Sequence, residues 1–549
     1  MPNFTPEEKE VLKPYVTSTE REVYAITGMN GIVGAAYARY SRSKLGFREM
    51  LLEEFMKDGE KIDYKHADEL IERVLIAYGD DSVGELEGAH VSFENISILA
   101  TKEIEDRRIG GSPLEKSTRY VFFDEKDENG KYKYVREPKI MASPFAKEYE
   151  ETMDFIFDTY AALIAPMQEF YKKRLPLETA AYDILGSGQK QKYNELKEEK
   201  DQKAFRITYN MDIRTKACDS LRCLLPISTK TNMGVFGNGR FYQYLISHLI
   251  SSDLEEVKQI GQETFEALTD VIKQYVRRAK VKEYNQKIDA EMKSLAKNIF
   301  GFLPFGLTEK VHLVPMELRD TEDYLVAHML YPFTRHSFSQ VYEVVKHLTP
   351  EQKERIKTTY VGDRSTRRDR PGRAFESGYT YTFDMLTDFG SYKDIMRHRM
   401  NTQLRQPFSP IHGMELPNDL IEAGFSPQAL ECHEKVLNFY NKAYPVIGDA
   451  ASYVALHGSR VRWLIGFNDR EAMHLLEIRT VPQGHPQYRK VAQLMHDQIA
   501  KVNPWRASIM KFVDHNDYSS ARGDSEAKQR IKEQQLDEKY GHSPTTADK

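Results

Sequence analysis

Three consecutive side chains that can carry positive charge, Arg397, His398 and Arg399, follow a segment whose mixed apolar and polar spacing predicts a helix. Successive positions around a helix diverge by about 100°, so the three side chains present charge over a broad arc. Such an arc suits a large polyanion with an aromatic plane, such as a dinucleotide, better than a single carboxylate. The alternative is a solvated basic helix end, because cations also favour a helix C-terminus.

The segment 111–121, GSPLEKSTRYV, concentrates groups that bind anions. An acceptor, a hydroxyl, a guanidinium and a phenol occur within six positions: Glu115, Ser117, Arg119 and Tyr120. Hydroxyls and an arginine suit a phosphomonoester, because the guanidinium fork matches two phosphate oxygens. A turn that carries a surface arginine is the alternative.

Arg222 lies in an apolar helix end just before Pro226. A buried arginine needs an anion, because an unpaired charge is costly away from water. The anion is either a ligand phosphate or the carboxylate of a structural salt bridge.

The pattern Asn-x-Arg occurs twice, as Asn238 with Arg240 and as Asn468 with Arg470. Each copy opens a predicted helix, where backbone N–H groups, an amide and an arginine together form a cradle for an anion or a nucleotide. The pattern is weak alone, and its recurrence at matched positions gives it weight.

The helix that begins at Asn468 carries two further candidates. His474 shares a helix face with Arg470, and Arg479 ends the helix, where a guanidinium could meet a pyrimidine carbonyl or an enolate-like oxygen. The alternatives are a structural histidine for His474 and a plain salt bridge for Arg479.

Composition bounds the function classes. The 549 residues are enough for two or more domains, with 40% hydrophobic and 29% charged residues. A net charge of −5 gives no global argument for nucleic-acid binding. The three cysteines form no C-x-x-C pair, which fits a reducing cytosol, and no metal site is predicted. No apolar run reaches transmembrane length, so we expect no membrane partner.

Strand and helix signals recur after residue 305, which predicts an α+β fold of two tandem units, each a β-sheet covered by helices. We expect the organisation to be an N-terminal arm, a first domain with an insertion near 126–205, a helical linker, a second domain and a mobile polar tail. The expected bounds of these five parts are 1–19, 20–280, 281–304, 305–514 and 515–549.

These motifs together resemble the flavin-dependent thymidylate synthases. That family's signature contains R-H-R with a small or hydroxyl residue three positions on, E-x-S-x-R-Y, A-R-x-x-L-P, N-x-R and a catalytic arginine at a helix end. In the first half of the chain, the loop 115–120, Arg222 and the pair at 238 and 240 match. Leu249 stands where the catalytic arginine belongs, and R-H-R is degraded near Arg107.

The second half has the opposite losses. R-H-R is intact at 397–399, and Arg479 matches the catalytic arginine. Pro407 and Ser409 occupy the serine and arginine positions of the substrate loop, and Ser452 replaces the arginine of R-x-x-L-P. We therefore expect one composite site that draws on both halves.

The resemblance implies an enzyme that methylates dUMP, or a related pyrimidine nucleotide, with FAD as cofactor and NADPH and methylenetetrahydrofolate as co-substrates. It also implies a homo-oligomer, here a dimer that imitates the family's tetramer. The alternatives are a nucleotide- or flavin-binding protein without turnover, and a scaffold that has lost the pocket. By this resemblance the catalytic residue is Arg479, the substrate residues are Glu115, Ser117, Arg119, Tyr120 and Arg222, and the cofactor residues are Arg397, His398, Arg399, Asn468, Arg470, His474, Asn238 and Arg240.

Overall fold

The computed structural model describes the chain except residues 1–3, 21–25, 27, 30–31, 41–43, 58–60, 63–83, 320, 367–368, 519–520 and 541–549. Its contacts divide the chain into two compact units. The first unit comprises 1–116, 137–139 and 230–286, and the second comprises 117–136, 140–229 and 287–549. Alternation over residues 20–27 predicts a strand, which lies almost entirely outside the described residues. Apolar spacing over residues 66–79 predicts a helix, which lies wholly outside them.

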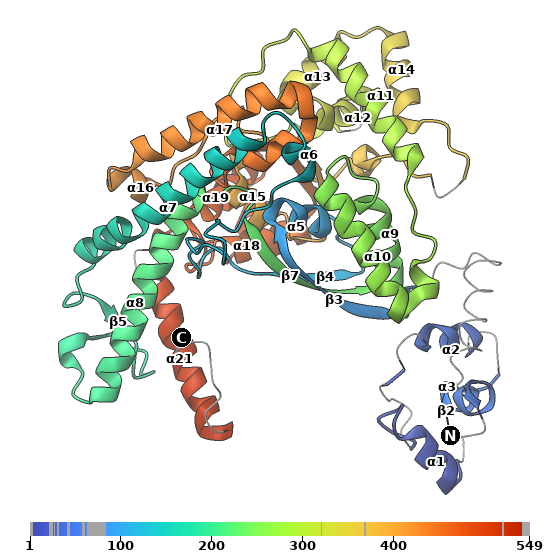
Figure 1. Ribbon diagram of the computed structural model, residues 1–549, viewed down its shortest axis with the longest axis horizontal. Helices are drawn as coiled ribbons and strands as arrows, with labels where there is room; N and C mark the ends of the chain where they lie inside the picture. The colour runs from blue at the N-terminus through green and yellow to red at the C-terminus, as the bar shows by residue number, and fades with distance from the viewer. Residues whose placement is uncertain are drawn as a thin grey trace. The chain divides into compact units, whose positions relative to one another are not determined.

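The first unit contains a three-stranded antiparallel sheet in the order β3-β7-β4, formed by Gly88–Ser97, Lys230–Asn238 and Gly111–Glu115. Strand β7 alternates buried and exposed side chains, the pattern of a strand with one face on a core. Helices α9 (Gly239–Leu249) and α10 (Glu255–Val276) lie side by side next to this sheet (Figure 1).

The second unit contains a four-stranded antiparallel sheet in the order β10-β11-β9-β8. The strands are Thr402–Arg405, Arg460–Phe467, Tyr381–Asp388 and Val311–Leu313. Every residue of β9 is buried, and β11 is buried after its first residue, so these strands are covered on both faces. The indole Nε1 of Trp463 is satisfied there by a hydrogen bond to Thr387 Oγ1, 3.1 Å away.

The two sheets confirm the α+β fold and the internal repeat. Three strands of each sheet correspond: β3, β4 and β7 in the first unit, and β9, β10 and β11 in the second. In both sheets the last of the three in the sequence, β7 or β11, lies between the other two. A helix follows the first strand of each set, α5 (Ile98–Glu105) or α15 (Phe389–Ile395), and another follows the central strand, α9 or α18 (Asp469–Arg479). The side chains of Asn238 and Asn468 both cap these latter helices by accepting the N–H three residues on.

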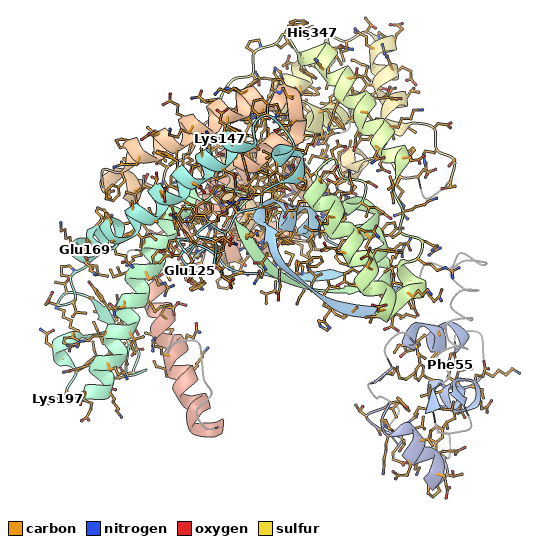
Figure 2. All side chains as sticks on the ribbon, in the orientation of Figure 1. Phe55, Glu125, Lys147, Glu169, Lys197 and His347 are labelled. Carbon is orange, nitrogen blue, oxygen red and sulfur yellow. The ribbon has the colours of Figure 1, made fainter. Side chains whose placement is uncertain are left out.

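Long helices complete the second unit. Helix α7 (Ala146–Arg174) packs against α8 (Glu199–Leu221) and α17 (Ser426–Ile447). It buries Tyr149 and Tyr160, while Lys147 and Glu169 lie on its outer face (Figure 2). The remaining elements are α1 Pro6–Leu12, α2 Val33–Tyr40, α3 Phe47–Met50, η1 Leu51–Phe55, β1 Met56–Lys57, β2 Lys61–Ile62, α6 Pro138–Met141, β5 Ala181–Tyr182, β6 Gln191–Lys192, η4 Tyr193–Glu195, η5 Arg222–Leu224, α11 Glu283–Phe300, η6 Met316–Leu318, α12 Glu322–Leu330, η7 Tyr331–Phe333, α13 Phe338–Lys346, α14 Pro350–Val361, η8 Arg373–Glu376, α16 Asn418–Glu422, η9 Gly448–Val454, α19 Pro486–Val502, α20 Pro504–Ser508 and α21 Ala521–Tyr540.

Besides the helical linker and the polar tail, the sequence predicts a helix near 447–456. The expected helical linker contains α11, and the expected helix near 447–456 is the 3-10 helix η9. The polar tail contains α21, which packs on α8 and is tied by an ion pair of 2.7 Å between Asp524 and Lys190. The domain bounds and the mobility of the tail stay predictions.

His328 provides a pH-sensitive contribution to stability. It is buried on α12, its Nδ1–H donates to the carbonyl of Tyr324 (2.8 Å), and its ring packs on Tyr324 and Phe338. Burial lowers the pKa of His328 to about 4. The unfolded chain, with a pKa of 6.5, therefore takes up this proton first as the pH falls.

We expect the free energy of unfolding to fall from pH 6.5 toward pH 4, with His328 contributing about 1.4 kcal/mol per pH unit. Denaturant unfolding across this range measures the slope. His328→Gln should have a shallower slope by this amount, whatever its absolute stability. Identical slopes in the two proteins would contradict the assignment.

Candidate arginine cluster in the second unit

Arg119 forms a two-pronged ion pair with Asp219 of α8. Its Nε and Nη2 donate to the two carboxylate oxygens at 2.8 and 2.7 Å, and Nη2 also reaches the carbonyl of Gln483 at 3.4 Å. Burial acts to raise the pKa of Asp219, but the guanidinium holds it below its ordinary value. Arg119 is thus fixed in one orientation.

Arg222 lies at the C-terminal end of α8, and only 2% of its surface is exposed. Its Nη1 donates to Asp394 of α15 at 3.1 Å. Among the residues that the structure describes, its Nε and Nη2 have no hydrogen-bond partner. The structural salt bridge is therefore present, and two buried N–H-bearing nitrogens remain for another acceptor.

Asp394 lies among four guanidiniums. Burial acts to raise its pKa, but the surrounding positive charge holds the pKa of this carboxyl well below its ordinary value. The four side chains responsible, which we call the arginine cluster, are Arg222, Arg397, Arg119 and Arg479. The cluster therefore joins residues of the first-half motifs with residues of the second-half motifs within one unit.

Arg479 is held by a hydrogen-bonded series. Its Nε donates to His398 Nε2 at 2.9 Å, and His398 Nδ1 lies 2.9 Å from Glu471 Oε1. Because Nε2 accepts from the guanidinium, the proton of the neutral imidazole is on Nδ1 and is donated to Glu471. Burial lowers the pKa of His398 and so favours the neutral imidazole, although Glu471 acts to raise this pKa.

The ring of Tyr488 lies beside two members of the cluster. The guanidinium carbons of Arg119 and Arg479 are 6.0 and 5.7 Å from its centroid. His485, the N-cap of α19, donates from Nε2 to the carbonyl of Asp219 at 3.1 Å. Burial, and next the charge of Arg222, lower the pKa of His485 to about 3, so this residue adds no charge near neutral pH.

The arginine cluster has the electrostatics of an anion site. The charges of four guanidiniums act on Asp394. Arg119 also pairs with Asp219, the charge of Arg222 also acts on the buried Asp388, and Glu471 pairs with the neutral His398. An added anion could accept from the two nitrogens of Arg222 that have no hydrogen-bond partner among the described residues. Phosphate and carboxylate have the oxygen geometry that guanidiniums bind.

The other predicted residues of the second unit lie around this cluster or on its elements. Ser117 Oγ accepts the backbone N–H of Arg119 at 3.2 Å, and Tyr120 is 38% exposed. Asn468 caps α18, and the ring of His474 lies 5.3 Å from that of His398. The exposed cations Arg397 and Arg399 follow α15, and Arg470 is exposed in the first turn of α18.

Three predicted residues belong to the first unit. The buried carboxylate of Glu115 pairs with Lys102 at 3.0 Å and accepts from Thr101. Asn238 caps α9, and Arg240 pairs with Glu85. Within that unit, Glu115 therefore forms a buried ion pair, and Arg240 forms an ion pair at the surface.

Sequence reasoning missed the residues that orient the arginines, namely Asp219, Asp394, Glu471, His485 and Tyr488. Only two left a local signal. Asp394 lies on α15, three positions before Arg397, which follows the helix, and Glu471 occupies the first turn of α18. The others depend on tertiary packing.

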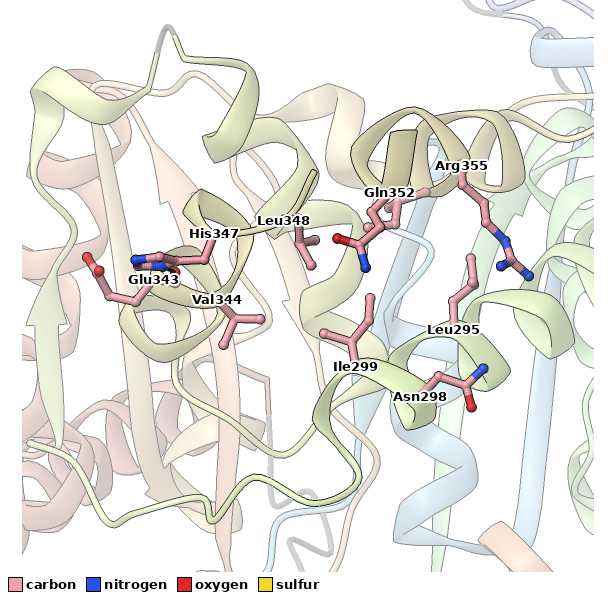
Figure 3. A pocket seen from close by; sticks show the side chains of 10 residues that line it. Leu295, Asn298, Ile299, Glu343, Val344, His347, Leu348, Gln352 and Arg355 are labelled. Carbon is pink, nitrogen blue, oxygen red and sulfur yellow. Dashed lines mark hydrogen bonds between the residues drawn. The ribbon is translucent and has the colours of Figure 1, made fainter. Parts of the chain in front are cut away.

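A cavity of about 660 Å³ lies elsewhere in the second unit, between α11, α13 and α14 (Figure 3). Its lining mixes Leu295, Ile299 and Val344 with polar side chains such as Gln352 and Arg355. No residue predicted to bind substrate or cofactor lines it. In the part of the chain that the structure describes, no helix is both long and apolar enough to cross a membrane.

Comparison with known proteins supports the duplication. The family model described as thymidylate synthase complementing protein matches residues 26–272 and 321–505. A UPF0159 protein of Chlamydia pneumoniae is 35% identical over 94% of this chain and 97% of its own length. UPF0159 proteins of Chlamydia muridarum and Thermoplasma acidophilum are 33% and 31% identical, over 96% and 91% of this chain and 99% and 98% of their own lengths.

Removing the carboxylate of Glu471 should destabilise the fold near Arg479. In Glu471→Ala the buried Nδ1–H of His398 loses its acceptor, which costs about 1–3 kcal/mol of unfolding free energy. Chemical denaturation measures the loss. Glu434→Ala, at an exposed position of α17, is the matched control, and equal losses in the two variants would refute the role.

Proposed function

Because the chain belongs to the thymidylate synthase complementing protein family, whose model covers most of both halves, we propose that it methylates dUMP, or a related pyrimidine nucleotide, reductively at C5. The carbon would come from methylenetetrahydrofolate and the reducing equivalents from NADPH. The C5 proton of the uracil ring is lost as the new carbon–carbon bond forms. The observation that carries the proposal is the convergence of Arg119 and Arg222 with Arg479 around Asp394.

Arg119 and Arg222 would bind the nucleotide phosphate. Arg119 is held by Asp219, and Arg222 keeps two buried nitrogens without a partner among the described residues. A phosphate would complete these hydrogen bonds in a site of low dielectric constant, where charged hydrogen bonds are strong. Ser117 and Tyr120 are proposed to add hydroxyl contacts, and Glu115 to complete the substrate loop.

Arg479 would polarise the pyrimidine carbonyls so that C5 becomes nucleophilic. The series from Glu471 through His398 sets the direction of its guanidinium before substrate arrives, and such preorganised donors stabilise developing negative charge. A cysteine adduct is disfavoured. All three free cysteines are buried. Burial raises the pKa of the Cys218 and Cys223 thiols far above its ordinary value, and it raises the pKa of Cys432 to about 11.

The second-unit donors proposed for FAD fit an anionic dinucleotide. Arg397, Arg399 and Arg470 are exposed cations at the end of α15 and the start of α18, and their guanidiniums match pyrophosphate oxygens. FAD, when bound, would supply hydride to the reaction. Asn468, His398 and His474, with Asn238 and Arg240 of the first unit, complete the proposed cofactor set. A homo-oligomer is proposed to bring these groups together.

The activity is tested by tritium release from C5-labelled dUMP in the presence of NADPH and methylenetetrahydrofolate. A flavin absorbance scan of the purified protein, with and without dUMP, accompanies it. Release that requires both co-substrates supports the enzyme. A flavin spectrum that responds to dUMP without any release would instead identify a binding protein that has lost turnover.

Substitution of the phosphate-binding arginines should weaken nucleotide affinity. Arg119→Ala and Arg222→Ala each remove a charged hydrogen-bond donor, at a cost of about 1.5–3 kcal/mol, or roughly 10- to 150-fold in Kd for dUMP. Calorimetric titration measures the change. Arg174→Ala, which loses only surface ion pairs with Asp419 and Glu422, should bind dUMP unchanged. Unaltered affinity in both cluster variants would count against the site.

Arg479→Ala should separate turnover from affinity. Loss of a donor that acts mainly on the transition state lowers kcat by roughly 10²- to 10³-fold, whereas the Kd for dUMP should change little. Single-turnover tritium release and calorimetry give the two quantities. A parallel loss of both would instead make Arg479 a general binding residue.

A further inference from the structure

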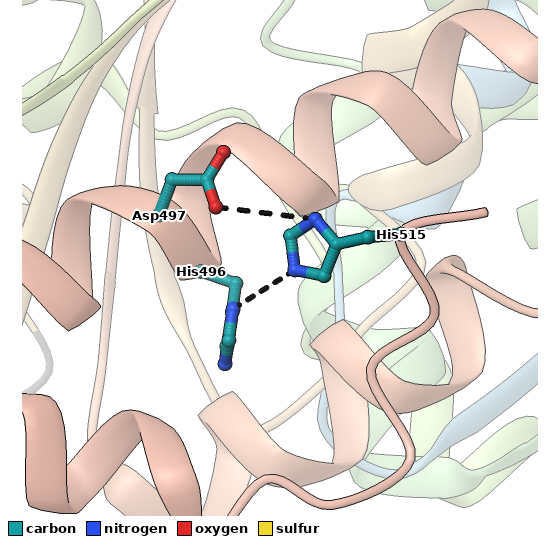
Figure 4. Close-up of side chains that lie close together, drawn as sticks. All are labelled: His496, Asp497 and His515. Carbon is teal, nitrogen blue, oxygen red and sulfur yellow. Dashed lines mark hydrogen bonds and ion pairs between the residues drawn. The ribbon is translucent and has the colours of Figure 1, made fainter.

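Two histidines and an aspartate that belong to none of the motifs above come together in the second unit. His496 and Asp497 lie on α19, and His515 lies on the segment that follows α20. One possible metal-ligand atom from each lies within 4.8 Å of the other two. Figure 4 shows the ring of His515 directed at both partners.

The distances and tautomers favour coordination. His496 Nδ1 and His515 Nε2 are 3.1 Å apart, close to the roughly 3.3 Å between two nitrogens on one tetrahedral zinc ion with bonds of about 2.0–2.1 Å. His496 Nε2 lies 3.2 Å from the carbonyl of Ala507 and donates to it. The lone pair of His496 is thereby placed on Nδ1, toward His515, as an outer hydrogen bond does for metal-binding histidines.

Asp497 can complete the set with an anionic ligand. Its Oδ1 lies 3.9 Å from His515 Nδ1, whereas His515 Nε2 faces His496. One ion can bind only one ring nitrogen of His515, so the carboxylate would turn toward the Nε2 side to reach the ion that His496 and His515 share. The side chains of His515 and Asp497 are 43% and 49% exposed, so an ion can enter from solvent and keep a water in its fourth position. We propose that His496, Asp497 and His515 bind one divalent transition-metal ion of the zinc class. Two imidazoles and a carboxylate are ligands that such ions prefer.

The ion would fasten a segment that supports Arg479. The N–H of Asp514, next to His515, donates to Thr480 Oγ1 at 3.0 Å, and the N–H of Phe512 donates to Glu477 Oε1 at 3.3 Å. Thr480 is the C-cap of α18, directly after Arg479. Metal binding would therefore hold the end of the helix that presents this arginine. The metal site itself does not depend on the proposed reaction.

The test uses the full chain, treated with EDTA and desalted, and titrated with Zn²⁺ against a chromophoric chelator and with Co²⁺ by absorption. We expect one equivalent of Zn²⁺ and the intense visible bands of tetrahedral Co²⁺. His496→Gln and His515→Gln should each weaken Zn²⁺ binding at least about tenfold and abolish the bands. His347→Gln, at an exposed histidine at the end of α13, should change neither.

Stability gives a second readout. Zn²⁺ should raise the Tm of the unmodified protein, because an ion that binds only the folded state stabilises it, and should leave the Tm of His515→Gln unchanged. If a glutamine variant does not fold, the nearly isosteric Asp497→Asn takes its place and should bind Zn²⁺ more weakly. Equal Zn²⁺ affinity in the variants and the unmodified protein, or no Zn²⁺ binding by the latter, would overturn the proposal.

Discussion

The carboxylate of Asp394 is the point on which the arrangement of the second unit depends. A buried guanidinium such as that of Arg222 is tolerated only beside an anion, and several guanidiniums close together repel one another. Asp394 offsets both costs, and this explains why its pKa stays low although burial alone would raise it. Helix α15, which carries Asp394, also leads directly into 397–399, so one short element sets the charge balance and presents the exposed cations.

The hydrogen bonds around the cluster divide the arginines into two kinds. Arg119 is oriented by the carboxylate of Asp219 and the carbonyl of Gln483. Arg479 is oriented by the neutral imidazole of His398, which is itself held by Glu471. Arg222 is held at one nitrogen only. The first two are ready-made donors of fixed direction, and the third retains the capacity to bind an incoming oxygen. This division matches the distinction between binding a phosphate and polarising a ring.

Local chemistry made much of the architecture predictable. Asn238 and Asn468 are helix caps because a short amide side chain reaches the N–H three residues on, which depends on sequence alone. The repeated strand and helix signals likewise predicted two sheets, although the order of the strands in them could not be predicted. The partners of the arginines could not be predicted, because Asp219 is distant in sequence from its partner Arg119, and Asp394 from its partner Arg222. For the same reason the pairing of Glu115 with Lys102 was invisible before the fold was known.

The way the chain is shared between its two units constrains how it can be divided. Residues 117–136 and 140–229, which precede the helical linker, fold with the C-terminal part, and α7 packs on α17. A cut in the linker would leave each fragment with unmatched apolar surface and would part Arg222 from Asp394. The two halves of the sequence therefore do not fold as two separate consecutive domains. This arrangement makes the fusion difficult to reverse, because each half, expressed alone, would lack the packing surface and the ion-pair partners that the other half provides.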